Sequence, residues 1–324
     1  MLVIFLKMMQ SWKNLKNNSN KAMKKLKLLI CLFAVFIFLS CEKVIEAKDL
    51  PEQDSRIVLN SLLFSEDLIT ANITASRGIL SNKAFKDLDN AVCQVFENDA
   101  YLGNLINIQN GNFTSFFTAK VNNKYRLIVS ASGYSSVTAT TIIPPSVKYT
   151  NLERYDTLNY NYRLNQYSPS EKSVGGTSKF KLKILDDLSA KNFYSIKPIV
   201  ILTDSLGNTI SENDGYAYIK NNNDENSYES TSFEIDDLTK VNGNQMQLDF
   251  DVSFYFNIPE NLKSIRVYIE ISNLSQEYYN YKMTLKKQAE AGGGFFSEPV
   301  LVYSNVINGL GILGGSSLTR FRIY

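Results

Sequence analysis

The chain has 324 residues, with 34 Lys and Arg, 32 Asp and Glu and no His, which gives a formal net charge of +2. Without histidine it cannot hold a Ser-His-Asp triad, a Cys-His nucleophile pair or a His-ligated zinc ion. Any catalysis would have to depend on Asp, Glu, Lys or Tyr side chains.

The N-terminal residues predict a secretory signal peptide. Residues 28–39 are twelve consecutive apolar residues, and a helix of that length spans about 18 Å, far less than the roughly 30 Å hydrocarbon core of a bilayer. Three lysines in MKKLK, residues 23–27, precede the run, as in the basic region of a secretory signal. Residues 1–40 are therefore predicted to be removed. Residues 1–22 are predicted to reflect a mis-assigned start, because a complete signal begins at Met23.

The apolar run ends in FLSC, residues 38–41, which resembles the lipobox of bacterial lipoproteins. The resemblance implies that the signal is cut before Cys41 and that the Cys41 thiol carries a lipid anchor. A buried core helix is the alternative, but it requires neither the lysines nor a cysteine at the end of the run.

Removal of residues 1–40 changes the charge balance. These residues hold seven lysines and no acid, so residues 41–324 keep 27 basic and 32 acidic residues and a net charge of −5. A nucleic-acid partner is therefore not expected. Besides Cys41, the remaining chain has Cys93 alone, which excludes a disulfide framework within the fold.

A β-rich region follows a short linker. Residues 41–55 are polar and charged and are predicted to be a tether. Apolar and polar side chains then alternate, for example over residues 69–75, as in a half-buried strand. Turn residues recur up to residue 145 while helix signals are few, so residues 56–145 are predicted to form an antiparallel β-sandwich. Cys93 lies in one such strand and is predicted to be a core residue.

Two segments of this region carry a resemblance. DNAVCQVFEN, residues 89–98, and GNFTSFFTAKVNNKYRLIVSASGY, residues 111–134, resemble the transthyretin-like or carboxypeptidase-regulatory type of β-sandwich. In that pattern a strand beginning Ala-Val precedes a turn and then Y-x-L-x-V-x-x-x-G-Y. The resemblance implies an immunoglobulin-like or transthyretin-like first domain. Pro144 and Pro145 are expected to end it, because neither can donate to a ladder.

Residues 146–324 are predicted to form a second β-rich, sandwich-like domain. It begins with a polar, Tyr- and Asn-rich segment, residues 146–178, in which Gly175 and Gly176 predict a loop. Alternation over residues 265–271 predicts a strand.

One helix is predicted near the C-terminus, over residues 275–291. Ser275 is its expected N-cap, and Gly292 to Gly294 end it. The stripe of Tyr278, Tyr281 and Leu285 is predicted to pack against the core.

Neither of two candidate chemical sites has the required pattern. The loop NNNDENS, residues 221–227, lacks the spacing of a calcium loop and is predicted to be exposed and metal-free. The acid pairs Asp186-Asp187 and Asp236-Asp237 are adjacent, so on a strand their carboxylates point to opposite faces. We therefore predict no metal, no cofactor and no enzymatic activity.

The C-terminal sequence SEPVLVYSNVINGLGILGG, residues 297–315, is the most distinctive part of the chain. Its glycines lack the lysine of a phosphate loop and are better explained by close backbone approach within a sheet. With RIVLNSLL (56–63), NAV (90–92), IPPSV (143–147) and YYNY (278–281), it resembles a family of Bacteroidetes envelope lipoproteins, domain of unknown function 4249. Leu313 departs from the aromatic residue usual in such tails and is expected to affect packing only.

The resemblance implies an outer-membrane lipoprotein, on either face of that membrane, that assists a TonB-dependent receptor in substrate binding or uptake. It provides no catalytic residues. The alternative is a fimbrillin-like adhesin or pilus subunit, which would need a proteolytic cut for which Arg56 is the plausible site. The tripeptides DTL and DSL match a short O-glycosylation motif of such bacteria, which predicts Thr157 and Ser205 as modification sites.

Overall fold

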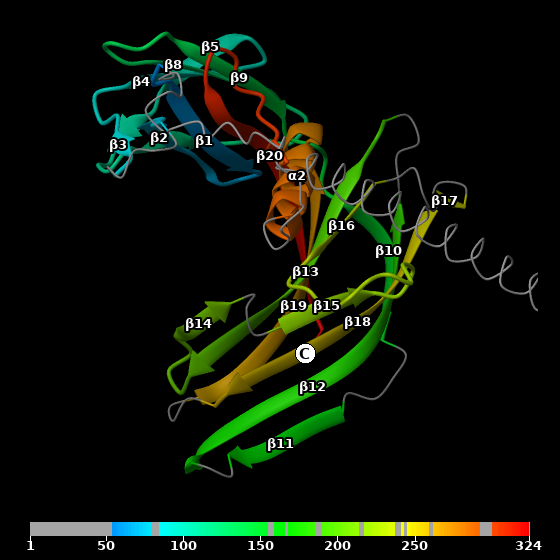
Figure 1. Ribbon diagram of the computed structural model, residues 1–324. Helices are drawn as coiled ribbons and strands as arrows, with labels where there is room; N and C mark the ends of the chain where they lie inside the picture. Colours follow the sequence, from blue (N-terminus) through cyan, green and yellow to red (C-terminus); the bar gives the residue numbers. More distant parts are fainter. Residues whose placement is uncertain are drawn as a thin grey trace, which may run out of the picture. The chain divides into compact units, whose positions relative to one another are not determined.

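The computed structural model describes residues 54–78, 84–154, 159–165, 168–185, 190–213, 217–236, 241–242, 245–258, 262–291 and 300–323 (Figure 1). Strands dominate these ranges, and the helix found among them is α2 (Gln276–Ala291). The prediction of a mainly β, sandwich-like fold with one helix near the C-terminus is therefore confirmed.

Within the described ranges the strands form three sheets. The longest has the order β14-β13-β19-β20-β1-β2-β7-β6, with β16 paired to β13 and β3 paired to β2. Its strands are β1 (Ile57–Phe64), β2 (Leu68–Ala75), β3 (Lys86–Asp87), β6 (Ile106–Asn107), β7 (Asn112–Thr118), β13 (Phe193–Asp204), β14 (Thr209–Asn213), β16 (Phe233–Asp236), β19 (Leu262–Leu274) and β20 (Leu310–Arg322).

Two smaller sheets, again counted over the described residues, complete the fold. One has the order β5-β4-β8-β9, and the other has the order β10-β12-β18-β15, with β11 paired to β12 and β17 to β18. Their strands are β4 (Val92–Glu97), β5 (Ala100–Asn104), β8 (Lys124–Ser130), β9 (Val137–Ile142), β10 (Lys148–Arg154), β11 (Asn159–Asn165), β12 (Ser168–Leu185), β15 (Ala217–Asn221), β17 (Val241–Asn242) and β18 (Gln245–Asn257).

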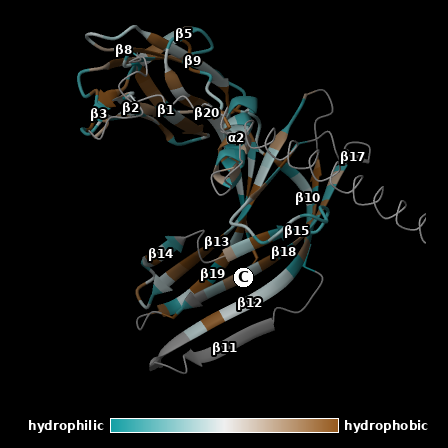
Figure 2. Ribbon diagram, in the orientation of Figure 1, coloured by the Kyte–Doolittle hydropathy of each residue, from teal (hydrophilic) through white to brown (hydrophobic). Residues whose placement is uncertain are grey.

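The first sandwich joins β1, β2 and β7 of the long sheet to β4, β8 and β9 through one apolar core. Along β2, every second side chain from Ile69 to Ala75 is buried, which confirms the predicted alternation. Figure 2 shows the hydrophobic residues of this core in brown along β1 and β8. The core includes Leu59, Ile73, Phe113, Leu127 and Val137.

A buried tyrosine fixes one corner of this sandwich. Tyr125 is 0% exposed, and its hydroxyl donates to Glu97 Oε1 (2.5 Å) and accepts from the backbone N–H of Lys120 (2.8 Å). The contact to a backbone group shortly upstream resembles the tyrosine corner of immunoglobulin-like sandwiches. The hydrogen bond from Tyr125 lowers the pKa of the Glu97 carboxyl. Burial and the bond to Glu97 raise the pKa of Tyr125 to about 12.

Tyr125→Phe is expected to lower the free energy of unfolding by about 2 kcal/mol at pH 7, because a charge-assisted bond and a backbone bond are lost. Because the pKa of Glu97 is lower in the folded state than in the unfolded state, its ionised carboxylate stabilises the fold at pH values above the unfolded-state pKa. This stabilisation is lost as the pH falls through the folded-state pKa. The deficit of the variant should therefore shrink at acid pH. Urea unfolding across pH 3–7 measures this. Tyr101→Phe, at a 56% exposed site, is the control and should change stability by less than about 0.5 kcal/mol. An equal deficit at every pH would contradict the role given to Glu97.

The second sandwich joins β13 and β19 of the long sheet to β12 and β18. Their side chains form two apolar clusters, which share the partly buried Ile323. Val267, Ile269 and Ile271 of β19 are buried, as the sequence predicts, but Glu270 between them is buried as well, so the burial does not alternate. The larger cluster includes Phe180, Leu182, Ile196, Phe250 and Ile269.

Strand β20, red in Figure 1, belongs to both sandwiches. Residues 310–316 pair in parallel with β1, and the second half of β20 pairs antiparallel with β19. Leu313 lies in the core of the first sandwich and Phe321 in that of the second. Gln53–Tyr324 forms one compact unit. The long sheet therefore continues across the boundary that the sequence indicates after residue 145, through a parallel pair that the sequence did not indicate.

The tail glycines lie where β20 passes close to other backbone. A Cβ at Gly315 would lie 2.5 Å from the carbonyl oxygen of Ile142. Gly311 has a φ of +108°, and a Cβ there would overlap the carbonyl group of Leu59 on β1. Both positions exclude a side chain, which confirms close backbone approach as the reason for the glycines.

The prediction of a loop at Gly175 and Gly176 is wrong. Both residues lie inside β12, where Gly175 pairs with Tyr255 of β18. A Cβ at Gly175 would lie 3.0 Å from the carbonyl oxygen of Phe254 and 3.1 Å from the Tyr255 ring. The glycine thus accommodates a close partner strand rather than a turn, and residues 148–154, 159–165 and 168–185 form strands.

The helix α2 begins with the predicted cap. The Ser275 hydroxyl accepts from the backbone N–H of Tyr278 (3.2 Å) and from that of Gly315 (3.1 Å). It therefore caps α2 and ties it to β20. Tyr278 packs on β20 at Gly314, where a Cβ would lie 2.8 Å from the Cβ of Tyr278.

The prediction that the stripe on α2 packs against the core is wrong beyond Tyr278. All residues of α2 are described and none is buried, and Figure 2 shows much of the helix in teal. Leu285 is 43% exposed, and Tyr281 lines an open cleft. The helix lies on the surface of the long sheet, so its tyrosines border solvent.

Candidate functional site

Among the predicted modification sites, Ser205 is the one that falls within the described residues. Cys41 and Thr157 lie outside them. Ser205 is exposed in the turn between β13 and β14. The carboxylate of Asp204 accepts hydrogen bonds from the side chain (3.1 Å) and backbone N–H (2.8 Å) of Asn208, and these bonds lower the Asp204 pKa. O-glycosylation of Ser205 is sterically allowed and stays a prediction.

Cys93 is a core residue, as predicted. It is fully buried in β4, and burial raises the pKa of its thiol to about 12. A neutral, buried thiol is inert toward substrates and metals. Of the predicted acid pairs, Asp236 is described and lies 3.5 Å from the ammonium of Lys191, while Asp186, Asp187 and Asp237 fall outside the described ranges.

Neither a metal cluster nor a helix able to span a membrane is found in the described part of the chain. No cluster of three or more Cys, Asp and Glu side chains suited to a metal ion occurs there. No helix in those ranges has the length and apolar character needed to cross a membrane.

Two open clefts lie beside α2. Tyr279 lines one and Tyr281 the other, and side chains two positions apart on a helix point about 200° away from each other. The first, which we name the polar cleft, has a volume of about 460 Å³ and is lined by the loop 221–226, by residues 234–236 of β16 and by Tyr279.

Hydrogen bonds hold the loop of the polar cleft in place. The side chain of Asn221 accepts from the N–H of Asn223 (3.0 Å), and that of Asp224 accepts from the N–H of Asn226 (3.0 Å). The Asn223 side chain in turn accepts from the N–H of Asp249 on β18 (2.7 Å). The Asn and Asp residues of NNNDENS thus serve to shape the loop, as Asx turns do.

Glu234 anchors the inner side of the polar cleft. Its side chain is 7% exposed and lies 2.7 Å from the ammonium of Lys282 on α2. It also accepts from the hydroxyls of Ser195 and Ser232, each at 3.1 Å. A buried carboxylate that is paired in this way, with all three contacts on Oε1, holds α2 on the sheet.

The second cleft, which we name the neutral cleft, lies over the outer face of β1, β2 and β7. Its volume is about 500 Å³, and none of its described lining residues is charged. Asn60, Asn72 and Asn112 stand in register on the three adjacent strands. Its other lining residues are Ser61, Leu62, Phe64, Thr70, Ala71, Ile108, Phe113, Tyr281 and Ile312.

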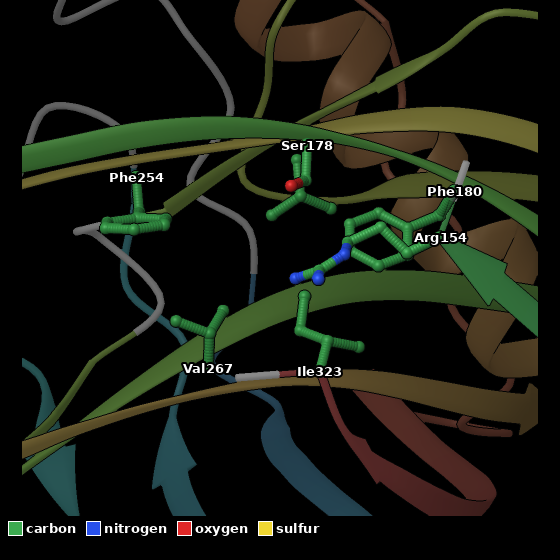
Figure 3. Close-up of a pocket in the computed structure, with 7 residues that line it drawn as sticks. Arg154, Ser178, Phe180, Phe254, Val267 and Ile323 are labelled. Carbon is green, nitrogen blue, oxygen red and sulfur yellow. The ribbon is translucent and has the colours of Figure 1, made fainter. Parts of the chain in front are cut away.

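A third space, inside the second sandwich, is too small for a ligand. Figure 3 shows it between Ser178 and Phe254 on one side and Val267 and Ile323 on the other, with the guanidinium of Arg154 directed into it. Its volume of about 10 Å³ suits one water molecule at most. The buried Ser178 hydroxyl has no hydrogen-bond partner among the described residues. A water molecule in this space would provide one.

Arg56, the cut site that the adhesin hypothesis requires, directly precedes β1. Its backbone N–H donates to the Ser76 hydroxyl (2.9 Å), and its carbonyl accepts from the Ser76 N–H (2.8 Å). The next strand, β1, is paired on both sides, with β2 and β20. Among the described residues, a cut after Arg56 would therefore leave β1 paired with both neighbours.

Sequence reasoning found the loop 221–227 but missed both clefts. Helical spacing predicts Tyr278 and Tyr281 to face the core, but such spacing does not distinguish a buried face from one that borders a cleft. The alignment of Asn60, Asn72 and Asn112 on neighbouring strands depends on long-range strand pairing, so no local sequence pattern predicts it. The sequence signal that remains is local: each of these asparagines has a buried apolar residue next to it in sequence, which predicts an asparagine on the outer face of its strand.

Comparison with known proteins places the chain in a family. No curated protein matches it. A solved structure described as "Chaperone-tip adhesin complex is vital for synergistic activation of CFA/I fimbriae biogenesis" is similar at 11% identity, over 67% of this chain and 76% of that chain, with a TM-score of 0.19. A TM-score this low carries no argument. Residues 45–322 match the family described as Domain of unknown function (DUF4249), and because the match spans most of its length the chain belongs to this family.

Proposed function

We propose that the protein is a lipid-anchored, non-catalytic accessory protein of the outer membrane that acts beside a TonB-dependent receptor in substrate binding or uptake. The lipobox that ends at Cys41 and the resemblance carried by the C-terminal sequence support the location. Lipidation would confine both partners to one membrane, which raises their effective concentration and lets a modest interface persist.

The polar cleft is the observation that carries the proposal. Its loop is exposed yet held by its own hydrogen bonds, so little conformational entropy is lost on binding. Asp224 and Glu225 make its rim acidic, which favours a basic surface on the partner. Loops on a rigid β scaffold commonly carry binding functions.

Affinity purification of the tagged protein from mildly solubilised outer membranes should recover one β-barrel receptor in near-equal amount. The double variant Asp224→Lys/Glu225→Lys is expected to lower this recovery at least about tenfold, because it opposes like charges across the interface. Quantitative mass spectrometry of the eluate measures the ratio.

The matched control is Glu66→Lys/Asp67→Lys in the exposed turn between β1 and β2, which makes the same change in net charge. It should leave receptor recovery unchanged. Recovery of the unaltered protein alone would overturn the proposal. A ladder of self-polymers would overturn it in favour of the adhesin or pilus subunit.

A further inference from the structure

We infer that the neutral cleft binds an uncharged oligosaccharide. The inference rests on the proposed function for its biological role and deepens it by naming a class of substrate. It is carried by three features of the cleft: a row of amides along the floor, apolar and aromatic side chains beside that row, and the lack of charge among the described lining residues.

The floor presents amides at a regular spacing. Asn60 pairs with Asn72 across β1 and β2, and Asn72 pairs with Asn112 across β2 and β7. Adjacent strands lie about 4.8 Å apart, which is close to the length of one pyranose residue. The row therefore offers amide groups at the repeat of a sugar chain that crosses the strands.

Part of this row remains available for a ligand. Asn72 Nδ2 donates to Asn112 Oδ1 (3.0 Å), which orients both amides. The side chain of Asn112 also donates to the carbonyls of Gln109 (3.3 Å) and Asn110 (3.2 Å). The exposed Asn60 amide makes no hydrogen bond to any described residue, so it can both donate to and accept from sugar hydroxyls.

Apolar and aromatic side chains flank the row of asparagine amides. Tyr281 of α2, with Phe64 and Leu62 of β1, lines the cleft together with Ile108, which is 57% exposed and precedes β7. A pyranose presents hydroxyls at its edge and C–H groups on its faces, so it needs amides and apolar surfaces together. The partly exposed ring of Tyr281 provides such an apolar surface.

Other classes of ligand fit less well. A charged ligand would find no counter-ion among the described lining residues. A peptide that adds a strand to the sheet needs a free edge. At the cleft floor β1 and β2 are paired on both sides, and β7 is paired with β2 and, at Phe113 and Thr114, with β6. The floor can therefore be recognised only through side chains.

Isothermal titration calorimetry on the full-length protein, in a detergent without a sugar headgroup, tests the inference. The probes are maltohexaose, cellohexaose, xylohexaose and mannohexaose, with hexagalacturonate as the charged comparison. At least one neutral hexasaccharide should bind, and hexagalacturonate should not. Tyr281→Ala and Asn60→Ala should each weaken that binding about tenfold, and Tyr281→Phe should recover most of the loss because it restores the ring.

Tyr218→Ala, at a 39% exposed tyrosine of β15 outside the cleft, is the control and should bind as the unaltered protein does. Thermal melting of each variant establishes that it folds.

Absence of binding by all four neutral probes, or equal binding by Tyr281→Ala, would overturn the inference. So would a self-association that Tyr281→Ala abolishes, because the cleft would then hold a second copy. Receptor recovery should be unaffected by the cleft variants. If the unaltered protein recovers its receptor but binds no neutral saccharide, this inference is rejected and the proposed function stands.

Discussion

Gly311→Val is expected to lower the free energy of unfolding by about 2–5 kcal/mol. Gly311 has a φ of +108°, and a Cβ there would overlap the carbonyl group of Leu59. The left-handed conformation costs a residue with a Cβ roughly 1–2 kcal/mol, and overpacking typically adds about 1–3 kcal/mol. Together these terms amount to about 2–5 kcal/mol, against a typical stability of about 5–15 kcal/mol. Urea unfolding, or loss of the protein from the folded fraction on expression, measures the effect.

Two other glycines separate the effect of the positive φ from the effect of the close backbone approach. Gly207 has a φ of +88° with no atom within 4 Å of its would-be Cβ, while Gly78 has the same open space without a positive φ. Gly207→Ala should therefore cost about 1 kcal/mol, and Gly78→Ala less than about 0.5 kcal/mol. If Gly311→Val were no more destabilised than Gly207→Ala, the close approach of β20 to β1 would be refuted.

Cys41→Ala is expected to abolish membrane attachment, since the proposed anchor is the lipid on this thiol. Each buried methylene contributes about 0.8 kcal/mol, and a second acyl chain turns marginal binding into stable anchoring. Metabolic labelling with an alkyne-tagged palmitate and fractionation of membranes measure the change. The variant should carry no label and should appear as an uncleaved or released form.

Cys93→Ala provides the matched control. Cys93 is fully buried in the first core, so its loss should affect packing and leave labelling and membrane location intact. Labelled Cys41→Ala protein in the membrane fraction would rule out Cys41 as the lipid site.

Local periodicity predicted the strands that have one face in a core. The alternation of Ile69 to Ala75 and of Val267 to Ile271 is a property of neighbours in sequence, because successive side chains on a strand point to opposite faces. Ser275 likewise predicts the start of α2, because an N-cap is a local hydrogen bond. These signals do not depend on which strand lies alongside.

Long-range pairing could not be predicted in this way. The parallel pairing of β20 with β1 joins residues about 250 positions apart, and Gly175 looked like a turn because its partner Tyr255 is invisible to a local pattern. The clefts beside α2 combine side chains from distant strands with Tyr279 or Tyr281. Cys41 could be proposed from sequence alone because the lipobox is a local motif.

The position of β20 also sets the order of events during synthesis. Strand β1 lies near the start of the described chain, yet its second neighbour, residues 310–316, is made some 250 residues later. Until then one edge of β1 exposes unpaired backbone groups, which is the kind of edge that invites wrong pairing. Contacts so distant in sequence also slow folding, because the loop must close before they form. The first sandwich therefore cannot complete its sheet as an independent N-terminal unit, because β1 lacks its second neighbour until residues 310–316 are present.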